Sequence, residues 1–333
     1  MKINISPAYV IALFLGFLSA MAQAGTHVEL RFADQNEETK NMVSASGEDK
    51  NLNYDITFAN FIGGPAILEA FRSDALDIGI VGNTPPIQAQ AANVPLLIVA
   101  ARENQSPDYQ YALRPGLSIT SLADFKNKKI AYAEGTAREV FILQTLKEAG
   151  LTPSDVTLVR LRAGDFPTAL QFGQVDIAPL TEQQFGRYIK QNNIPKTAFP
   201  DALYQTLPKK QVYLYASKKS LDNPDKKDAI NDFITRWVNA NKWTELHQSE
   251  WINAYYVKSQ GLSSEDGKTV LQIRGQSTFP LLTSMISNQQ KLIDILSASG
   301  SIPHSLSAEK EFDLRFNTVA TQAAQSYNKV EAQ

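Results

Sequence analysis

Residues 76–92 have the sequence LDIGIVGNTPPIQAQAA, and this stretch decides the expected fold. Leu76–Gly82 is a short, mostly apolar run, which is typical of a buried strand. Residues 83–86 include two prolines and predict a rigid turn, after which Ile87–Ala92 begins a helix. A strand that leads through a turn into a helix is the unit from which α/β folds with parallel sheets are built.

The same succession of elements is predicted on both sides of this stretch. Nearby strands are expected at Val28–Ala33, Asn53–Phe58 and Pro95–Ala100, with one helix that ends at Ser46 and another at Ala66–Phe71. Farther along, strands are expected at Lys129–Ala133, Val156–Leu161, Val175–Leu180 and Val212–Ala216, with helices at Arg138–Ala149, at Pro167–Gln171 and over most of the chain from Lys226. The pattern predicts an α/β protein of two lobes, each a mainly parallel sheet flanked by helices.

A recurring tetrapeptide supports two similar lobes. Leu76-Asp77-Ile78-Gly79 returns in related form as Val175-Asp176-Ile177-Ala178, which we interpret as similar architecture and not as a sequence repeat. A cleft between such lobes would collect strand ends and helix N-termini, where open α/β sheets bind ligands. With crossovers expected near residues 103–111 and 209–217, the predicted lobes are 25–108 with 215–333, and 109–214.

The N-terminus has the pattern of a secretory signal peptide over residues 1–24. Lys2 precedes an apolar run that extends from Pro7 to Met21, and Ala22-Gln23-Ala24 is an Ala-x-Ala cleavage site. The alternative is an uncleaved membrane anchor, but the apolar run is shorter than the roughly 20 residues that span a bilayer. We therefore expect a periplasmic protein that is not inserted in the membrane.

Composition narrows the classes of function. The chain has no cysteine, which excludes a lipid-anchored lipoprotein, thiolate metal sites and cysteine nucleophiles. The three histidines have no metal-binding spacing, and we expect neither a metal nor a cofactor. The net charge of −2, which loss of Lys2 makes one unit more negative, argues against nucleic-acid binding. An anionic ligand would have to be held by a local site.

Three predicted helix starts offer donors for such an anion. Helix N-termini have unpaired backbone N–H groups and a partial positive charge, and glycine lets a ligand approach the backbone closely. The three starts are Gly64, Asn83-Thr84 and Gly135-Thr136. Each has a simpler explanation as an ordinary N-cap or turn.

Two charged residues are further candidates for ligand contact. Arg162 follows a predicted strand, and its guanidinium would suit an anion with several oxygens, although a surface salt bridge is equally expected. Glu182 would bind an amine on the ligand or stabilise lobe closure. Arg138 lies in the first turn of its helix, where the helix dipole disfavours a cation. A functional role would explain this position, but an exposed side chain would as well, and we favour the exposed side chain.

Several segments resemble the periplasmic aliphatic-sulfonate-binding proteins, a group that also includes taurine- and nitrate-type receptors. The similarity covers most of the chain after residue 24. It is carried by Gly64–Ala70, Leu76–Gly79, Gly82–Ala92, Leu122–Ile130, Gly135-Thr136 and Glu148–Leu151, and the block around Thr84-Pro85-Pro86 is its most specific part. The resemblance implies a two-lobed fold that traps its ligand on closure, with an ABC permease and its ATPase as partners. It also implies ligand contacts from Gln35, Gly64, Asn83, Thr84 and Thr136.

The sequence departs from this family at two expected cleft edges. Acidic residues gather at Asp34, Glu37 and Glu38, and Thr181-Glu182-Gln183 stands where sulfonate binders tend to have Trp-Asp-Pro. The ligand therefore remains open among alkanesulfonates, taurine, sulfate esters, aromatic sulfonates and nitrate-like anions.

Other classes of function remain as alternatives to a monomeric transport receptor. Enzymes that resemble this group include a sulfinate desulfinase, which needs a Cys, and a thiamine-pyrimidine synthase, which needs a placed His. Neither residue is found where these enzymes would require it. A secreted sensory or structural module would lack donors that face the cleft.

Overall fold

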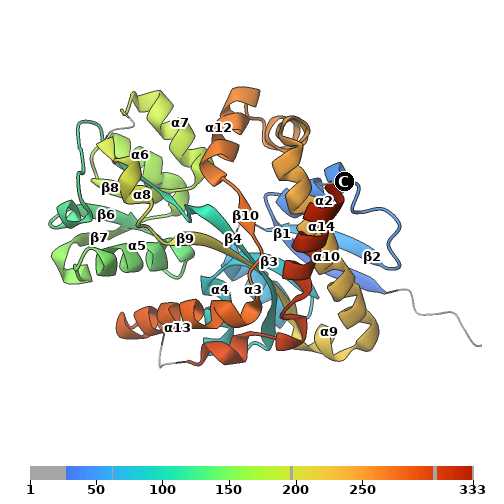
Figure 1. Ribbon diagram of the computed structural model, residues 1–333. Helices are drawn as coiled ribbons and strands as arrows, with labels where there is room; N and C mark the ends of the chain where they lie inside the picture. Colours follow the sequence, from blue (N-terminus) through green and yellow to red (C-terminus); the bar gives the residue numbers. More distant parts are fainter. Residues whose placement is uncertain (1–27, 62, 196–197, 303–305, 332–333) are drawn as a thin grey trace, which may run out of the picture.

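The computed structural model describes residues 28–61, 63–195, 198–302 and 306–331, and it has two sheets joined by long strands (Figure 1). The larger sheet has the strand order β10-β4-β9-β3-β1-β2, and the smaller has the order β5-β8-β6-β7. The predicted signal peptide lies outside the described residues. The predicted α/β fold with two lobes is confirmed, and "larger lobe" and "smaller lobe" below mean the parts built on these two sheets.

The larger sheet mixes parallel and antiparallel pairs. Its strands are β1 (Glu29–Gln35), β2 (Asp55–Phe61), β3 (Ile78–Gly82), β4 (Leu96–Pro107), β9 (Lys209–Ser217) and β10 (Ser277–Thr278). Strands β1, β2 and β3 pair in parallel, whereas β9 lies antiparallel between β3 and β4. This sheet has more antiparallel pairing than the pattern predicted, because β9 returns from the smaller lobe in the opposite direction.

Helices cover the larger sheet and hold most of its core. They include α2 (Glu38–Ser46), α3 (Gly64–Arg72), α4 (Thr84–Ala91), α9 (Lys218–Asp222), α10 (Pro224–Leu246), α11 (Gln248–Trp251), α12 (Ser264–Arg274), α13 (Leu282–Ala298) and α14 (Val319–Glu331). A π-helical segment, η5 (Ile252–Ser259), continues α11. Trp237 and Trp251 from these helices are fully buried in the same cluster as Phe32 of β1. The predicted helical C-terminal part is therefore confirmed as a covering layer of the larger lobe.

The smaller sheet is mainly parallel, as predicted. Its strands are β5 (Gln110–Leu113), β6 (Lys129–Tyr132), β7 (Thr157–Arg160) and β8 (Ile177–Leu180), and only β5 is antiparallel to its neighbour. Helices α5 (Ala137–Glu148), α6 (Phe166–Gln171), α7 (Glu182–Asn192) and α8 (Asp201–Tyr204) surround it (Figure 1). The chain enters this lobe between β4 and β5 and leaves it before β9.

One local prediction was wrong. Residues 83–86 form no separate turn before the helix, because α4 already begins at Thr84. Proline is well accommodated in the first turn of a helix, where its missing N–H has no partner in any case. Pro85 and Pro86 therefore start the helix instead of preceding it.

The recurring tetrapeptide has the same structural role in both lobes. The Asp77 carboxylate accepts from the Arg31 backbone N–H at 3.0 Å and from Arg31 Nε at 2.8 Å. In the smaller lobe, the Asp176 carboxylate accepts from the Lys129 backbone N–H at 2.9 Å and from Arg114 Nε at 2.7 Å. Each aspartate thus ties the start of its strand to the neighbouring parallel strand.

Candidate ligand-binding site

A cavity of about 620 Å³ lies between the two lobes. The larger lobe contributes the end of β1 and the starts of α2 and α3, and the smaller lobe contributes the starts of α5 and α7. The residues that line the cavity include Asp34, Gln35, Glu38, Gly64, Pro85, Arg102, Asp108, Tyr109, Gly135, Thr136, Arg138, Glu182, Lys210, Tyr255 and Arg274. Such a volume is within the usual range for small-molecule sites.

Polar contacts join the lobes at more than one place. Gln88 Nε2 of α4 donates to the carbonyl of Gly135, which lines the cavity, at 2.5 Å. Lys190 Nζ of α7 lies 3.6 Å from the Asp266 carboxylate of α12. The lobes therefore touch through separate pairs of helices and loops.

The start of α3 is the least occupied of the helix N-termini in the lining. No side chain caps this helix, whose N-cap is Gly63. A Cβ added to Gly64 would lie 2.7 Å from Pro85 Cγ, so a larger residue would require α3 and α4 to separate. Gly64 thus lets the two helices pack closely while the start of α3 faces the cavity.

The start of α5 has its polar groups engaged within its own turn. Thr136 Oγ1 accepts from the Arg138 backbone N–H at 3.3 Å and donates to the Ala133 carbonyl at 2.7 Å. Gly135 has φ of +70°, in the left-handed region that favours glycine, and its N–H donates to Glu139 Oε2 at 2.7 Å. Thr136 is therefore an N-cap, and its contact with a ligand remains a prediction.

Two other sequence candidates also line the cavity. Gln35 Nε2 donates to the Ile80 carbonyl at 3.1 Å, so the amide is oriented by β3. Glu182 lies in the first turn of α7 and is only 5% exposed. Lys210 Nζ is 3.8 Å from Glu182 Oε1, and this oxygen has no hydrogen bond to any described residue.

Three sequence candidates lie outside the lining. Thr84 is buried, and its hydroxyl donates to Asn83 Oδ1 at 3.3 Å. The Asn83 carbonyl accepts from Gln289 Nε2 at 2.9 Å, away from the cavity lining. Because α4 begins at Thr84, Pro85 is the residue of this turn that reaches the cavity. Arg162 is exposed, and its neighbour Ala163 lines the cavity instead.

Most of the charged residues of the lining were not predicted to contact a ligand. The lining contains four cations (Arg102, Arg138, Lys210 and Arg274) and four carboxylates (Asp34, Glu38, Asp108 and Glu182). Of these, only Glu182 was a candidate for ligand contact, although Asp34 and Glu38 were expected at an edge of the cleft. Charges in a strand, a crossover and a distant helix show no common local motif, so only the tertiary fold reveals that they meet.

Arg138 was expected to be exposed, and this expectation was wrong. Its side chain is half-buried in the lining, and the guanidinium carbon lies 4.7 Å from the centre of the Tyr109 ring. Arg138 Nε also donates to the Pro179 carbonyl at 3.3 Å. These contacts hold a cation at the start of α5 in spite of the helix dipole.

Two buried arginines lie on the larger-lobe side. Arg102 of β4 is 3% exposed and donates to Asn241, and Arg274 Nη1 at the end of α12 donates to Glu38 Oε1 at 2.7 Å. The Nε atoms of both arginines are buried and have no hydrogen bond to a described residue. Burial works against the charge of Glu38, but Arg274 and Arg102 outweigh it and lower the pKa of Glu38 to about 2.

Two carboxylates of the lining hold their protons more tightly than usual. Burial raises the pKa of Asp34 to about 6, even though Asp34 accepts from the backbone N–H groups of Gln35, Thr39 and Lys40. Burial also raises the pKa of Asp108 to about 6. Asp34 is thus engaged in capping α2, whereas Asp108 has no hydrogen bond or ion pair to its carboxylate among the described residues.

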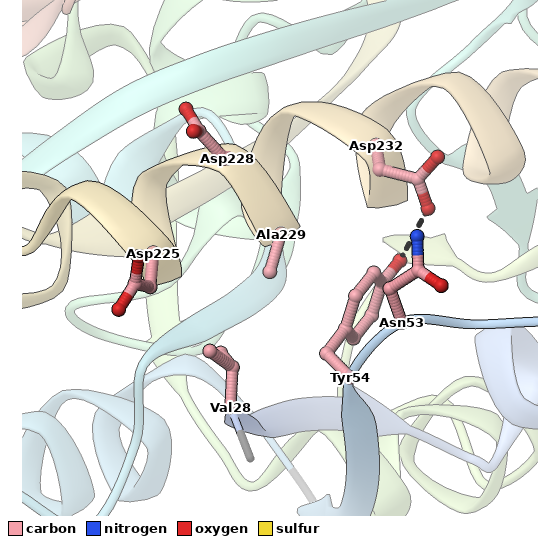
Figure 2. Close-up of a pocket in the computed structure, with 7 residues that line it drawn as sticks. All are labelled: Val28, Asn53, Tyr54, Asp225, Asp228, Ala229 and Asp232. Carbon is pink, nitrogen blue, oxygen red and sulfur yellow. Dashed lines mark hydrogen bonds between the residues drawn. The ribbon is translucent and has the colours of Figure 1, made fainter. Parts of the chain in front are cut away.

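A second hollow, of about 440 Å³, lies beside α10 and has a different chemistry (Figure 2). Asp225, Asp228 and Asp232 of this helix line the hollow, and the Tyr54 hydroxyl donates to Asp232 at 2.9 Å. Its lining contains no cation, so it does not suit an anionic ligand. The cavity between the lobes is therefore the candidate site.

Two sheets joined by crossing strands, with a cavity between the lobes, define the class: this is the periplasmic-binding-protein fold. The chain belongs to the NMT1/THI5-like family, whose profile matches residues 50–247. The family resemblance seen in the sequence is confirmed.

Three relatives that are named for sulfonate binding agree with this assignment. A protein of Escherichia coli (strain K12) that is named as an aliphatic sulfonates-binding protein is 26% identical over 261 residues, 78% of each chain. The crystal structure of the periplasmic aliphatic sulphonate binding protein SsuA from Escherichia coli matches with a TM-score of 0.74 at 22% identity, over 86% of this chain and 92% of that one. The alkanesulfonate-binding protein SsuA from Xanthomonas axonopodis pv. citri, bound to MOPS, matches with a TM-score of 0.74 at 21% identity, over 87% and 99%.

No helix within the described ranges is both long enough and apolar enough to cross a bilayer. Among the same residues, no group of three histidines or carboxylates is arranged to hold a metal ion.

Proposed function

We propose that the protein binds a small organic anion, an alkanesulfonate, in the cavity between its lobes and delivers it to an ABC permease. The observation that carries this proposal is the meeting of helix N-termini and buried arginines from separate parts of the chain at one cavity. The sulfonate-binding names of the relatives point to the same class of ligand.

The donors of the cavity suit a sulfonate head group. A sulfonate spreads one negative charge over three oxygens, so it is stabilised by several convergent N–H groups. The uncapped start of α3 offers backbone N–H groups, and the dipoles of α3, α5 and α7 favour an anion. Arg102 and Arg274 add buried guanidinium groups, which match multi-oxygen anions well. Pro85 and Val212 supply apolar surface for a short organic tail.

The residues of the cavity do not favour the enzyme alternative. Its described lining contains neither Cys nor His, the residues that the related enzyme classes would need. The three relatives described above are named as sulfonate-binding proteins. We therefore propose a receptor without catalysis.

The remaining parts of the proposal concern location and partners. Cleavage after Ala24 would release a periplasmic monomer beginning at Gly25, which works with a permease and its ATPase. Residues 25–108 with 215–333 and residues 109–214 would close on the ligand about the crossovers. N-terminal sequencing of the exported protein tests the cleavage site, and recovery of Met1 from membranes would contradict it.

Thermal unfolding with matched compounds tests the ligand class. A ligand at a hundredfold excess over its Kd stabilises the folded state by about 2.7 kcal/mol. At the roughly 2–4 °C per kcal/mol typical of somewhat smaller proteins, the expected shift in Tm is several degrees. Propane-1-sulfonate should raise Tm more than sulfate, which lacks the tail, and more than 1-propanol, which lacks the charge. A shift with only uncharged or cationic compounds would contradict an anion receptor.

A further inference from the structure

The two lobes share an apolar cluster. Val140 of α5 belongs to the smaller lobe and is only 1% exposed. It lies in the same buried cluster as Ile87 of α4 and as Leu292, Ile293 and Leu296 of α13, which all belong to the larger lobe. Helix α5 contacts both of these helices. Separation of α5 from them would expose apolar surface on both lobes to water, which is unfavourable.

The larger lobe also holds the polar groups at the start of α5. The Gly135 carbonyl accepts from Gln88 Nε2 of α4, and the Gly135 N–H donates to Glu139 Oε2. Ser301, which follows α13, donates from its hydroxyl to Glu139 Oε1 at 3.1 Å. Gly135 is thus tied to the larger lobe directly and through Glu139. Because Gly135 lines the cavity, these contacts fix the start of α5 there.

The starts of α3, α4 and α5 form one packed group. A Cβ added to Gly64 of α3 would collide with Pro85 of α4. A Cβ added to Gly82, the last residue of β3, would lie 3.8 Å from the Cβ of Ala137, the first residue of α5. Two of these helices belong to the larger lobe and one to the smaller, so the group extends across both lobes.

The contact between α7 and α12 is of a different kind. These helices lie side by side at the top of Figure 1. Lys190 and Asp266 form an ion pair there, and their side chains are 75% and 39% exposed. No described apolar cluster contains residues of both helices. An exposed ion pair contributes little free energy, so this contact opens at a lower cost than the contact of α5.

We propose that α5 remains docked on the larger lobe when the cavity opens, and that Val140 is the positioning residue that anchors it. The cavity then opens between α7 and α12, as the smaller lobe turns about the α5 contact and the crossovers. The starts of α3 and α5 stay together in the open state. An arriving anion would meet donors that are already in place, which reduces the cost of ordering them on binding. This inference rests on the proposed function for its ligand, but the docking of α5 can be tested without one.

Distances between two spin labels in the free protein test the docking. The chain has no cysteine, so introduced cysteines are the only labelling sites. One protein carries Gln191→Cys on α7 and Lys268→Cys on α12. The other carries Lys147→Cys on α5 and Asp294→Cys on α13, and all four positions are exposed.

The two labelled proteins should behave differently. Without ligand, the α7–α12 pair should give a broad distribution that extends to long distances, whereas the α5–α13 pair should give one narrow distance. An α5–α13 distribution as broad as that of the α7–α12 pair would overturn the proposal. So would a single narrow α7–α12 distance that a bound ligand leaves unchanged.

Saturating propane-1-sulfonate separates this proposal from the proposed function. The ligand should shift the α7–α12 distribution to its shortest distances and leave the α5–α13 distance unchanged. If the sulfonate binds and the α5–α13 distance changes, the docking fails and the receptor stands. If calorimetry detects no binding, the sulfonate receptor fails, and the distributions of the free protein still decide whether α5 stays docked.

Two valine substitutions test whether Val140 anchors α5. Val140→Ala should broaden the α5–α13 distribution of the free protein and weaken binding of propane-1-sulfonate several-fold, because the helix start then has to be ordered on binding. The matched control is Val175→Ala, since Val175 is fully buried in the core of the smaller lobe. It should lower the Tm but keep the wild-type distances and affinity. A narrow α5–α13 distance in Val140→Ala, or equal broadening in both variants, would refute the anchor.

Discussion

Arg274 Nη1 lies 2.7 Å from Glu38 Oε1, a contact that joins residues 236 positions apart in the sequence. It links the last residue of α12 to the first residue of α2 at the edge of the cavity. The side chain of Arg274 is only 11% exposed, so its charge acts in a region that water screens weakly. In the proposed site, the Glu38 carboxylate and the ligand anion therefore compete for the same guanidinium.

This competition predicts opposite effects for two substitutions. Arg274→Gln should weaken binding of propane-1-sulfonate about tenfold or more, because a hydrogen bond to a charged group contributes about 1.5–3 kcal/mol. Glu38→Gln should tighten binding, because it frees the guanidinium. The control is Arg72→Gln at the exposed end of α3, which should change neither. Titration calorimetry measures the affinity of each variant for propane-1-sulfonate. A change of affinity in the same direction in both cavity variants would refute this competition.

The contacts of Thr136 predict a larger effect on stability than on affinity. Thr136→Ala should lower the free energy of unfolding by about 1 kcal/mol, because it removes the N-cap of α5. Affinity for the sulfonate should fall less than tenfold, since the hydroxyl proton is engaged by the Ala133 carbonyl. Thr136→Ser should restore stability. A loss of affinity of a hundredfold with unchanged stability would mean that the hydroxyl turns to the ligand.

The sequence predicted what depends on local patterns. The strand and helix order, the Asp77 and Asp176 tetrapeptides and the helix starts at Gly64 and Thr136 all have signals within a few residues. The N-cap of α5 is likewise local, and this helix begins at the cavity, whereas α7, which also begins there, was not predicted. This is why the α/β architecture and part of the site were predictable.

The rest of the site depends on long-range contacts. Arg102 lies in strand β4 and Arg274 is the last residue of helix α12. In the sequence, neither residue differs from an ordinary surface charge, because only the packing of β4 and α12 in the fold brings both to the cavity. The two prolines after Thr84 were interpreted as a turn, although proline is equally compatible with a first helical turn. Thr84 was selected as a donor at this helix start, whereas Pro85 is the residue of the turn that lines the cavity.

The aspartates that tie the strands should matter unequally. Asp77 is 2% exposed and also ion-pairs with Lys226 Nζ at 2.7 Å, whereas the side chain of Asp176 is 20% exposed. Asp77→Asn should therefore lower the free energy of unfolding by about 2 kcal/mol, because the amide replaces a buried carboxylate that accepts hydrogen bonds from charged groups. Asp176→Asn should cost less. Denaturant unfolding of both variants measures these losses of free energy. A larger loss in Asp176→Asn than in Asp77→Asn would show that burial does not determine how much each aspartate stabilises the fold.

Glu311 predicts a pH dependence of stability away from the cavity. Burial raises its pKa to about 8, although Gln289 Nε2 donates to its carboxyl at 2.6 Å. Between the ordinary pKa of 4.5 and about 8, the folded protein keeps a proton that the unfolded chain releases. The free energy of unfolding therefore falls as the pH rises through this range.

Glu311→Gln should remove this contribution. Relative to wild type, the variant should gain stability progressively from pH 6 to pH 9, by more than about 1 kcal/mol, because one pKa unit corresponds to about 1.4 kcal/mol. Glu309→Gln is the matched control, since Glu309 is exposed in the same short helical turn. A constant difference across this pH range would mean that Glu311 titrates normally.

Binding of an organic anion between the lobes is tested most directly by diffraction at the bromine absorption edge. Crystals grown with saturating 3-bromopropane-1-sulfonate should show an anomalous peak inside the cavity, with the sulfonate oxygens between the starts of α3 and α5 and near Arg274. Anomalous density confined to the outer surface, with an empty cavity, would contradict the account.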